Sequence, residues 1–256
     1  MAAIAALLDG RGAVTALRRS LPRGGPGVVS CRLPANLRQL LERRLVEAVV
    51  FTPRTDPHAE WASLRSDFPD IPVVAYAPFR PDDGELLAEC RRQRVAAVVV
   101  EGVDDPVVGE LVRRVSLAAS RRRALADAPR LLRLADPLQR QVWDLLVDRV
   151  DQPVTTAELA ERLGVSREHL SRQFGAGGAP NLKRVIDFLR VVGAAQLLHN
   201  PGYAVARVAG LLAFASSSHL GSTAKRIAGV GTSELQRITP AELLTRFVRG
   251  HTRSRL

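Results

Sequence analysis

The sequence predicts two structural classes in one chain, an α/β domain followed by an all-helical domain. Over about the first 120 residues, short apolar runs alternate with amphipathic stretches, as in strand–helix units around a parallel sheet. From Pro137 onward this alternation stops and every segment has helical periodicity. Charge changes as well: residues 1–118 hold 16 basic and 15 acidic residues, whereas residues 119–256 hold 21 and 11. Such a basic half, joined to a neutral one, is typical of a nucleic-acid-binding domain.

The first half predicts five strand–helix units. The expected strands are residues 3–8, 27–31, 48–51, 72–76 and 96–100. The expected helices are residues 13–20, 36–44, 58–66 and 83–92, with a fifth from Pro106 onward. The strands are short and apolar throughout, as expected when helices cover both faces of a sheet. We therefore expect a flavodoxin-like (βα)5 three-layer domain over residues 1–118.

A linker is expected between the two halves. Residues 119–136 carry an arginine triplet and Pro129, and the helix from Pro106 is expected to run into this segment until the proline interrupts it. The helical domain then covers residues 137–248, and residues 249–256 form a tail.

A helix-turn-helix unit is predicted at residues 159–174, LAERLGVSREHLSRQF. Ala160 is small where two helices must cross closely, and Gly164 suits a left-handed turn. Ser166 can cap the second helix. Val165 and Leu170 are expected to make the apolar contacts between the two helices. Thr155 or Thr156 is expected to cap the first helix, with Glu158 two or three residues further on. An ordinary helical hairpin is the alternative.

A second unit, with one extra residue in its turn, follows 49 residues after the first, so that Ala209 is equivalent to Ala160. Its matching residues are Val208, Ala209, Ala213, Phe214, Ser216 and Leu220. Residues 182–200 between the units have helical periodicity and would span roughly 28 Å. A rod of that length can hold two recognition helices about one turn of B-DNA apart, in successive major grooves.

These residues resemble the DNA-binding domain of AraC-type transcription regulators. The match covers roughly residues 137–235 and rests on Leu159, Ala160, Ser166, Leu170, Arg172, Phe174, Arg190, Ala194, Leu197, Leu198, Ala209, Phe214, Ser216, Ser218, Lys225 and Gly229. The resemblance implies recognition helices at residues 166–174 and 216–227. The second unit departs from the family at Ala213, Leu220, Ser222, Ala224 and, further on, Thr232. We therefore expect weaker contacts from the second unit.

Candidate DNA contacts follow from these helices. On the first helix they are Ser166, Arg167, His169, Ser171 and Arg172; on the second they are Ser216, Ser217, His219, Ser222 and Lys225. Arginine is the commonest reader of guanine edges, and serine and histidine can contact bases or phosphates. A solvated helix face is the alternative for each of them. Arg190 is expected to tie helices together.

The N-terminal half resembles a response-regulator receiver that lacks its chemistry. The resemblance rests on the βα order and on residues 71–102. A receiver has a phosphate-accepting aspartate after its third strand, where Thr52 stands, and an acidic pair after its first strand, where only Asp9 remains. A hydroxyl residue and a lysine end its fourth and fifth strands, where Ala77 and Glu101 stand. We expect a pseudo-receiver that responds to protein contacts or a small ligand, or that only dimerises.

Composition limits the remaining classes. No apolar run is long enough to span a membrane, and Cys31 and Cys90 show neither metal nor disulfide spacing. We expect a cytoplasmic homodimer that binds double-stranded DNA, without catalytic residues, metal or cofactor. The transcription machinery or an unknown small-molecule effector are further possible partners. A protein-binding adaptor, or an enzyme in the α/β domain, is the alternative, although phosphate loops, nucleophile elbows and metal-ligand clusters are missing from the sequence.

Overall fold

A computed structural model describes residues 2–22, 26–54, 59–150 and 154–253. The chain divides into two compact units. The first comprises Met1–Ser120 with Asn200–Tyr203, and the second comprises Arg121–His199 with Ala204–Leu256. His58, the first residue of a predicted helix, and the last three residues of the predicted tail lie outside the described residues.

The first unit contains a parallel five-stranded sheet in the order β2-β1-β3-β4-β5. Its strands are β1 (Ala3–Leu7), β2 (Gly27–Ser30), β3 (Val46–Phe51), β4 (Val73–Ala77) and β5 (Ala97–Val100). Every residue of β3 and β4 is buried, which explains why these strands are apolar apart from Glu47 in β3. The strand order confirms the predicted flavodoxin-like fold.

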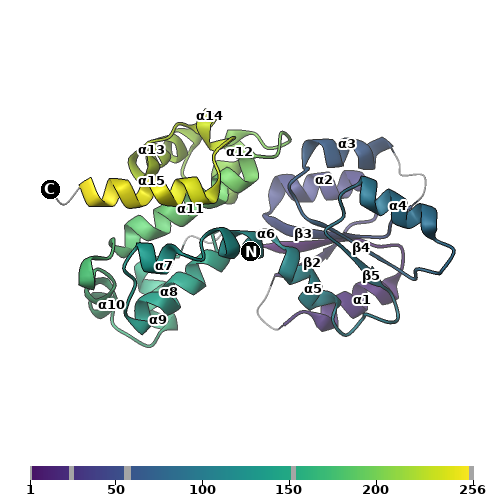
Figure 1. The fold of residues 1–256 in the computed structure, drawn as a ribbon, viewed down its shortest axis with the longest axis horizontal. Helices are drawn as coiled ribbons and strands as arrows, with labels where there is room; N and C mark the ends of the chain where they lie inside the picture. Colours follow the sequence, from purple (N-terminus) through teal and green to yellow (C-terminus); the bar gives the residue numbers. More distant parts are fainter. Residues whose placement is uncertain (1, 23–25, 55–58, 151–153, 254–256) are drawn as a thin grey trace. The chain divides into compact units, whose positions relative to one another are not determined.

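Helices cover both faces of this sheet. They are α1 (Arg11–Ser20), α2 (Pro34–Arg43), α3 (Ala59–Asp67), α4 (Gly84–Arg92) and α5 (Val108–Val115). Helices α1 and α5 lie on one face, and α2, α3 and α4 lie on the other (Figure 1). Ile4, Val50 and Tyr76 are fully buried in the core between α1, α5 and the sheet.

The second unit is entirely helical. Its α-helices are α6 (Leu117–Ala124, which begins in the first unit), α7 (Ala128–Leu131), α8 (Pro137–Asp148), α9 (Thr156–Arg162), α10 (Arg167–Phe174), α11 (Leu182–Leu198), α12 (Val205–Leu211), α13 (Ser217–Ala228), α14 (Thr232–Leu235) and α15 (Pro240–Arg253). Helix α11 runs between α7–α10 on one side and α12–α15 on the other (Figure 1). Among the described residues, none of the helices is long and apolar enough to cross a membrane.

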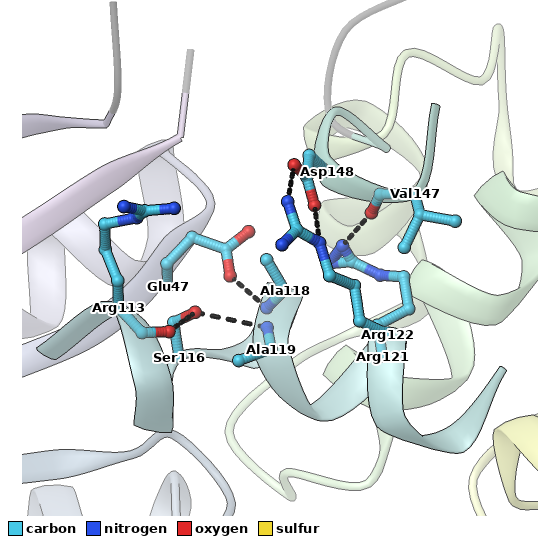
Figure 2. Close-up of polar contacts among 9 residues, drawn as sticks. All are labelled: Glu47, Arg113, Ser116, Ala118, Ala119, Arg121, Arg122, Val147 and Asp148. Carbon is cyan, nitrogen blue, oxygen red and sulfur yellow. Dashed lines mark hydrogen bonds and ion pairs between the residues drawn. The ribbon is translucent and has the colours of Figure 1, made fainter. Parts of the chain in front are cut away.

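The expected continuous helix from Pro106 to Pro129 is wrong. Helix α5 ends at Val115, and Ser116 adopts an extended ψ of 162°. Its hydroxyl donates to the Arg113 carbonyl at 2.8 Å and accepts from the Ala119 N–H at 3.2 Å, so it starts the new helix α6 (Figure 2). Pro129 lies in the first turn of the separate helix α7, where a missing N–H costs no hydrogen bond.

The two ends of α6 contact different residues. Near its start, the carboxylate of the buried Glu47 accepts a hydrogen bond from the Ala118 N–H at 2.6 Å (Figure 2). Further on, Arg121 is 1% exposed and donates to the Val147 carbonyl and to Gln196, at 3.0 and 3.1 Å. The residues 119–136 therefore include a buried arginine that is part of the second unit's core.

Arg121 and Arg122 provide a matched pair of substitutions. Arg121→Met leaves the Val147 carbonyl and the Gln196 amide without this donor, so we expect it to destabilise the protein by roughly 1–3 kcal/mol. Arg122 is half-exposed and pairs with Asp148, so Arg122→Met is expected to cost less than about 1 kcal/mol. Chemical denaturation of both variants measures the difference. Equal losses would contradict a structural role for Arg121.

Candidate nucleic-acid interface

The first helix-turn-helix unit consists of α9 and α10, and each helix has a side-chain cap. The Thr155 hydroxyl accepts the Glu158 N–H at 3.2 Å, and the Glu158 carboxylate accepts the Thr155 N–H at 2.7 Å. The Ser166 hydroxyl accepts the His169 N–H at 3.1 Å. These bonds satisfy N–H groups that the first turn of a helix otherwise leaves unpaired. Both caps are at the residues that the sequence indicated.

The turn between α9 and α10 depends on a left-handed residue. Gly164 has φ +64°, and the next N–H, that of Val165, donates back to the Ala160 carbonyl at 3.0 Å. Ala160 is buried where the helices meet, and Leu170 on α10 is fully buried. The apolar contacts and the glycine thus fix the angle at which α10 leaves the turn.

The second unit, α12 and α13, repeats this geometry. Ala213 has φ +56°, and the Phe214 N–H donates to the Ala209 carbonyl at 2.8 Å. The Ser216 hydroxyl accepts the His219 N–H at 3.1 Å and caps α13. Ala215 is the extra residue of this turn, so the predicted second unit and its insertion are confirmed.

Helix α10 presents exposed polar side chains, namely those of Arg167, His169, Ser171 and Arg172. In the described part of the chain, Arg167 and Arg172 make neither an ion pair nor a side-chain hydrogen bond. Guanidinium groups in this state keep all their donors for a ligand. Ser166 is also exposed, but its hydroxyl already serves as the cap.

The candidate residues of α13 are engaged to a greater extent. The His219 Nδ1 accepts the Ala215 N–H at 3.3 Å, and its ring lies edge-on to Phe214. The Ser222 hydroxyl donates to the His219 carbonyl at 3.1 Å, and Ser217 is half-buried. Lys225 is exposed and, within the described ranges, has no charged partner. Local bonds therefore occupy several polar groups on α13, in contrast to the arginines of α10.

Polar contacts hold α13 and the turn before it against α11. Arg190 donates to the Leu212 carbonyl at 3.0 Å, and its guanidinium lies 4.0 Å above the Phe214 ring. Asp187, also on α11, pairs with Arg226 of α13 at 2.9 Å. Burial lowers the pKa of the Arg190 guanidinium, and Asp187 opposes that effect. Arg190 thus ties helices together rather than facing solvent.

Sequence reasoning missed Gln139, which positions α10 from outside the helix-turn-helix unit. Its Nε2 donates to the carbonyls of Phe174 and Gln173 at 2.9 and 3.2 Å, and its Oε1 accepts the Asp136 N–H at 3.0 Å. Asp136 accepts from the Gln173 side chain, and this bond, followed by the Leu138 N–H, holds the pKa of its carboxyl below the ordinary value. The available signal was the Asp-x-x-Gln capping box before α8.

Comparison with known proteins supports the assignment of this region. Residues 159–238 match a family described as a helix-turn-helix domain, which confirms the AraC-type resemblance for that segment. A domain of this kind implies a transcription regulator. A comparison of the chain with curated proteins finds no match.

Two solved response regulators were found by structural comparison. Full-length FixJ from B. japonicum is 15% identical, with 90% of this chain and 98% of that chain covered and a TM-score of 0.36. RcsB from Salmonella typhimurium is also 15% identical, with 74% and 98% covered and a TM-score of 0.36. Both scores are too low to relate the overall structures.

The two turns allow a reciprocal test of backbone strain. An added Cβ at Gly164 meets no atom within 4 Å, so Gly164→Ala is expected to cost about 1 kcal/mol through its positive φ alone. Ala213→Gly removes the same strain and is expected to stabilise the protein by about 0.5–1 kcal/mol. Thermal unfolding of the two variants checks the opposite signs. A loss of stability in both would show that Ala213 is not strained.

Proposed function

We propose that this chain is a sequence-specific DNA-binding transcription regulator whose helices α10 and α13 enter successive major grooves. The observation that carries this proposal is the presence of two helix-turn-helix units, each with a serine cap on its second helix, on either side of one buried helix, α11. The 17 residues of α11 span about 25 Å, and the two units lie on either side of it, so α10 and α13 are proposed to stand about one turn of B-DNA apart, roughly 34 Å. The excess positive charge of residues 119–256 favours binding to phosphates.

The proposed DNA contacts are the candidates on each helix, all exposed except the half-buried Ser217: Ser166, Arg167, His169, Ser171 and Arg172 on α10, and Ser216, Ser217, His219, Ser222 and Lys225 on α13. Arg167 and Arg172 are proposed to supply most of the base discrimination, because among the described residues their guanidinium groups form no ion pair or side-chain hydrogen bond. We also propose residues 1–118 as the regulatory domain and residues 137–248 as the DNA-binding domain, acting in the cytoplasm.

Selection of bound sequences from a random DNA pool, with the full chain at near-physiological salt, tests the main proposal. An enriched sequence with two half-sites is expected, and its affinity should fall with a slope of about −0.9 in log[salt] for each phosphate contacted. Failure to enrich any sequence, together with no binding at low salt, would instead favour an adaptor that binds only protein.

The two half-sites are expected to be unequal. Arg172→Ala should weaken binding to the selected DNA by roughly 1–3 kcal/mol if the guanidinium makes a bidentate base contact. Ser222→Ala is the matched substitution on α13, and it should cost less because that hydroxyl already bonds to His219. Fluorescence anisotropy with labelled duplex measures both affinities. Equal losses would remove the proposed asymmetry.

We further propose that the first unit works without phosphorylation. Thr52 follows β3 and accepts the Asp9 N–H at 3.2 Å, while Asp9 itself is paired with Arg54 at 3.1 Å. Ala77 ends β4, and Glu101 directly follows β5. A phosphoryl group needs an acceptor aspartate, a metal held by several carboxylates and a nearby cation, and these positions do not supply that set.

Incubation with acetyl phosphate and Mg²⁺ checks this second proposal. Intact-mass measurement is expected to show no added phosphoryl group on the chain, whereas a receiver with its acceptor aspartate, treated in parallel, should gain one. A stable aspartyl phosphate within residues 1–118 would contradict the proposal.

Dimerisation through the first unit is the remaining part of the proposal. Large apolar side chains are exposed there, at Leu87, Val98, Val103 and Val107. Exposed apolar groups of this kind favour contact with another protein surface, and two DNA-binding modules on one element gain effective concentration. Light scattering of the full chain should give twice the mass of one chain. A monomer, with and without DNA, would contradict the proposal.

A further inference from the structure

A pocket opens in the first unit at the carboxyl ends of β1 and β3. Its volume is about 120 Å³. The lining residues come from the ends of β1 and β3, the start of α2, helix α3 and the end of α4: Leu7, Asp9, Arg32, Leu33, Pro34, Phe51, Thr52, Arg54, Trp61 and Gln93. Helix α1, which follows β1, and helix α3, which follows β3, lie on opposite faces of the sheet (Figure 1). Ligands of open α/β sheets bind in the crevice that this divergence creates.

One side of the pocket is aromatic and rigid. The rings of Phe51 and Trp61 stack with centroids 4.6 Å apart, and both residues are buried. The Trp61 Nε1–H donates to the Gln93 side chain at 2.7 Å, which fixes the indole ring. Leu33, by contrast, is 59% exposed at the pocket. These groups provide an apolar surface for the body of a small molecule.

Three charged residues line the pocket, and one of the two arginines has no ionic partner among the described residues. Asp9 and Arg54 form an ion pair at 3.1 Å. Arg32 is exposed and, among the described residues, forms no ion pair or side-chain hydrogen bond. Pro34, the first residue of the ten-residue helix α2, also lines the pocket, so the positive end of that helix dipole faces the same space. An anionic group beside Arg32 would be favoured by both charges.

We propose that this pocket binds a small organic monocarboxylate. The carboxylate pairs with the Arg32 guanidinium, and a short acyl chain or a single ring packs against Leu33 and the Phe51–Trp61 stack. Cavities of roughly 150 Å³ hold one benzene ring, so the size of the body is limited to about that of a ring. Inorganic phosphate lacks an apolar body and gains little from the aromatic wall. This binding does not depend on the proposed DNA recognition, and either can fail without the other.

Calorimetric titration of the full chain tests the ligand class with four probes. Benzoate and hexanoate are expected to bind. Benzamide has the shape of benzoate without its charge and should bind at least about tenfold more weakly, as should inorganic phosphate. Failure of both carboxylates to bind up to about 10 mM, a range that detects a Kd near 1 mM, would overturn the proposal. Equal affinity for benzamide or phosphate would overturn it as well.

Substitution at Arg32 then locates the site. Arg32→Gln should weaken benzoate binding at least about tenfold, because a charge-assisted hydrogen bond is lost. Arg43→Gln, at the exposed C-terminal end of α2, is the control and should leave the affinity unchanged. Both positions are exposed, so folding should be preserved. Unchanged affinity in Arg32→Gln would contradict the proposed site.

Trp61 provides a second readout inside the pocket. Trp143 lies in the second unit, so in a Trp143→Phe background the tryptophan emission reports Trp61 alone. Hexanoate, which does not absorb in this range, is expected to shift or quench that emission with the same Kd as in calorimetry. Calorimetric binding without any change in Trp61 emission would place the ligand elsewhere and overturn the assignment.

Discussion

Burial of helix α11 is the constraint on which both helix-turn-helix units depend. Thirteen of its residues are buried, from Leu182 to Leu198, and it contacts α8 on one side and α12, α13, α14 and α15 on the other. A helix that is apolar nearly all round must be covered by others. Gly193 permits one close approach, because an added Cβ would lie 3.0 Å from Val150. The two units hold their positions because this helix has to be enclosed.

Local patterns predicted the fold well because they act over a few residues. The five strands were expected within two residues of their observed ends, since continuous apolar runs mark strands covered on both faces. The cap at Ser166 followed from the preference of serine for that position, whereas for the second unit the sequence left three neighbouring serines, residues 216–218, as possible caps. The left-handed turn at Ala213 was indicated by its alignment with Gly164, although alanine has no intrinsic preference for it.

Polar groups that act across long stretches of chain could not be predicted in this way. Arg121 lies in an arginine triplet that looks exposed, and only its packing beneath Val147 and Gln196 makes it a core residue. Gln139 reaches the end of α10 from 34 residues away. At the candidate interface, the residue types on the exposed helix faces could be predicted. Whether the Ser222 hydroxyl or the Arg172 guanidinium is free for DNA depends on neighbouring groups that only the structure shows.

The difference between α10 and α13 has a consequence for the proposed DNA target. Counted from the cap serines, Arg167 and Arg172 of α10 correspond to Ser217 and Ser222 of α13. In the proposed DNA complex, one chain would place a charged reader at one end of its target and a neutral reader at the other. Within the stretch that one chain covers, a palindrome would therefore satisfy only one of the two helices. Each chain would bind an asymmetric stretch in a single direction.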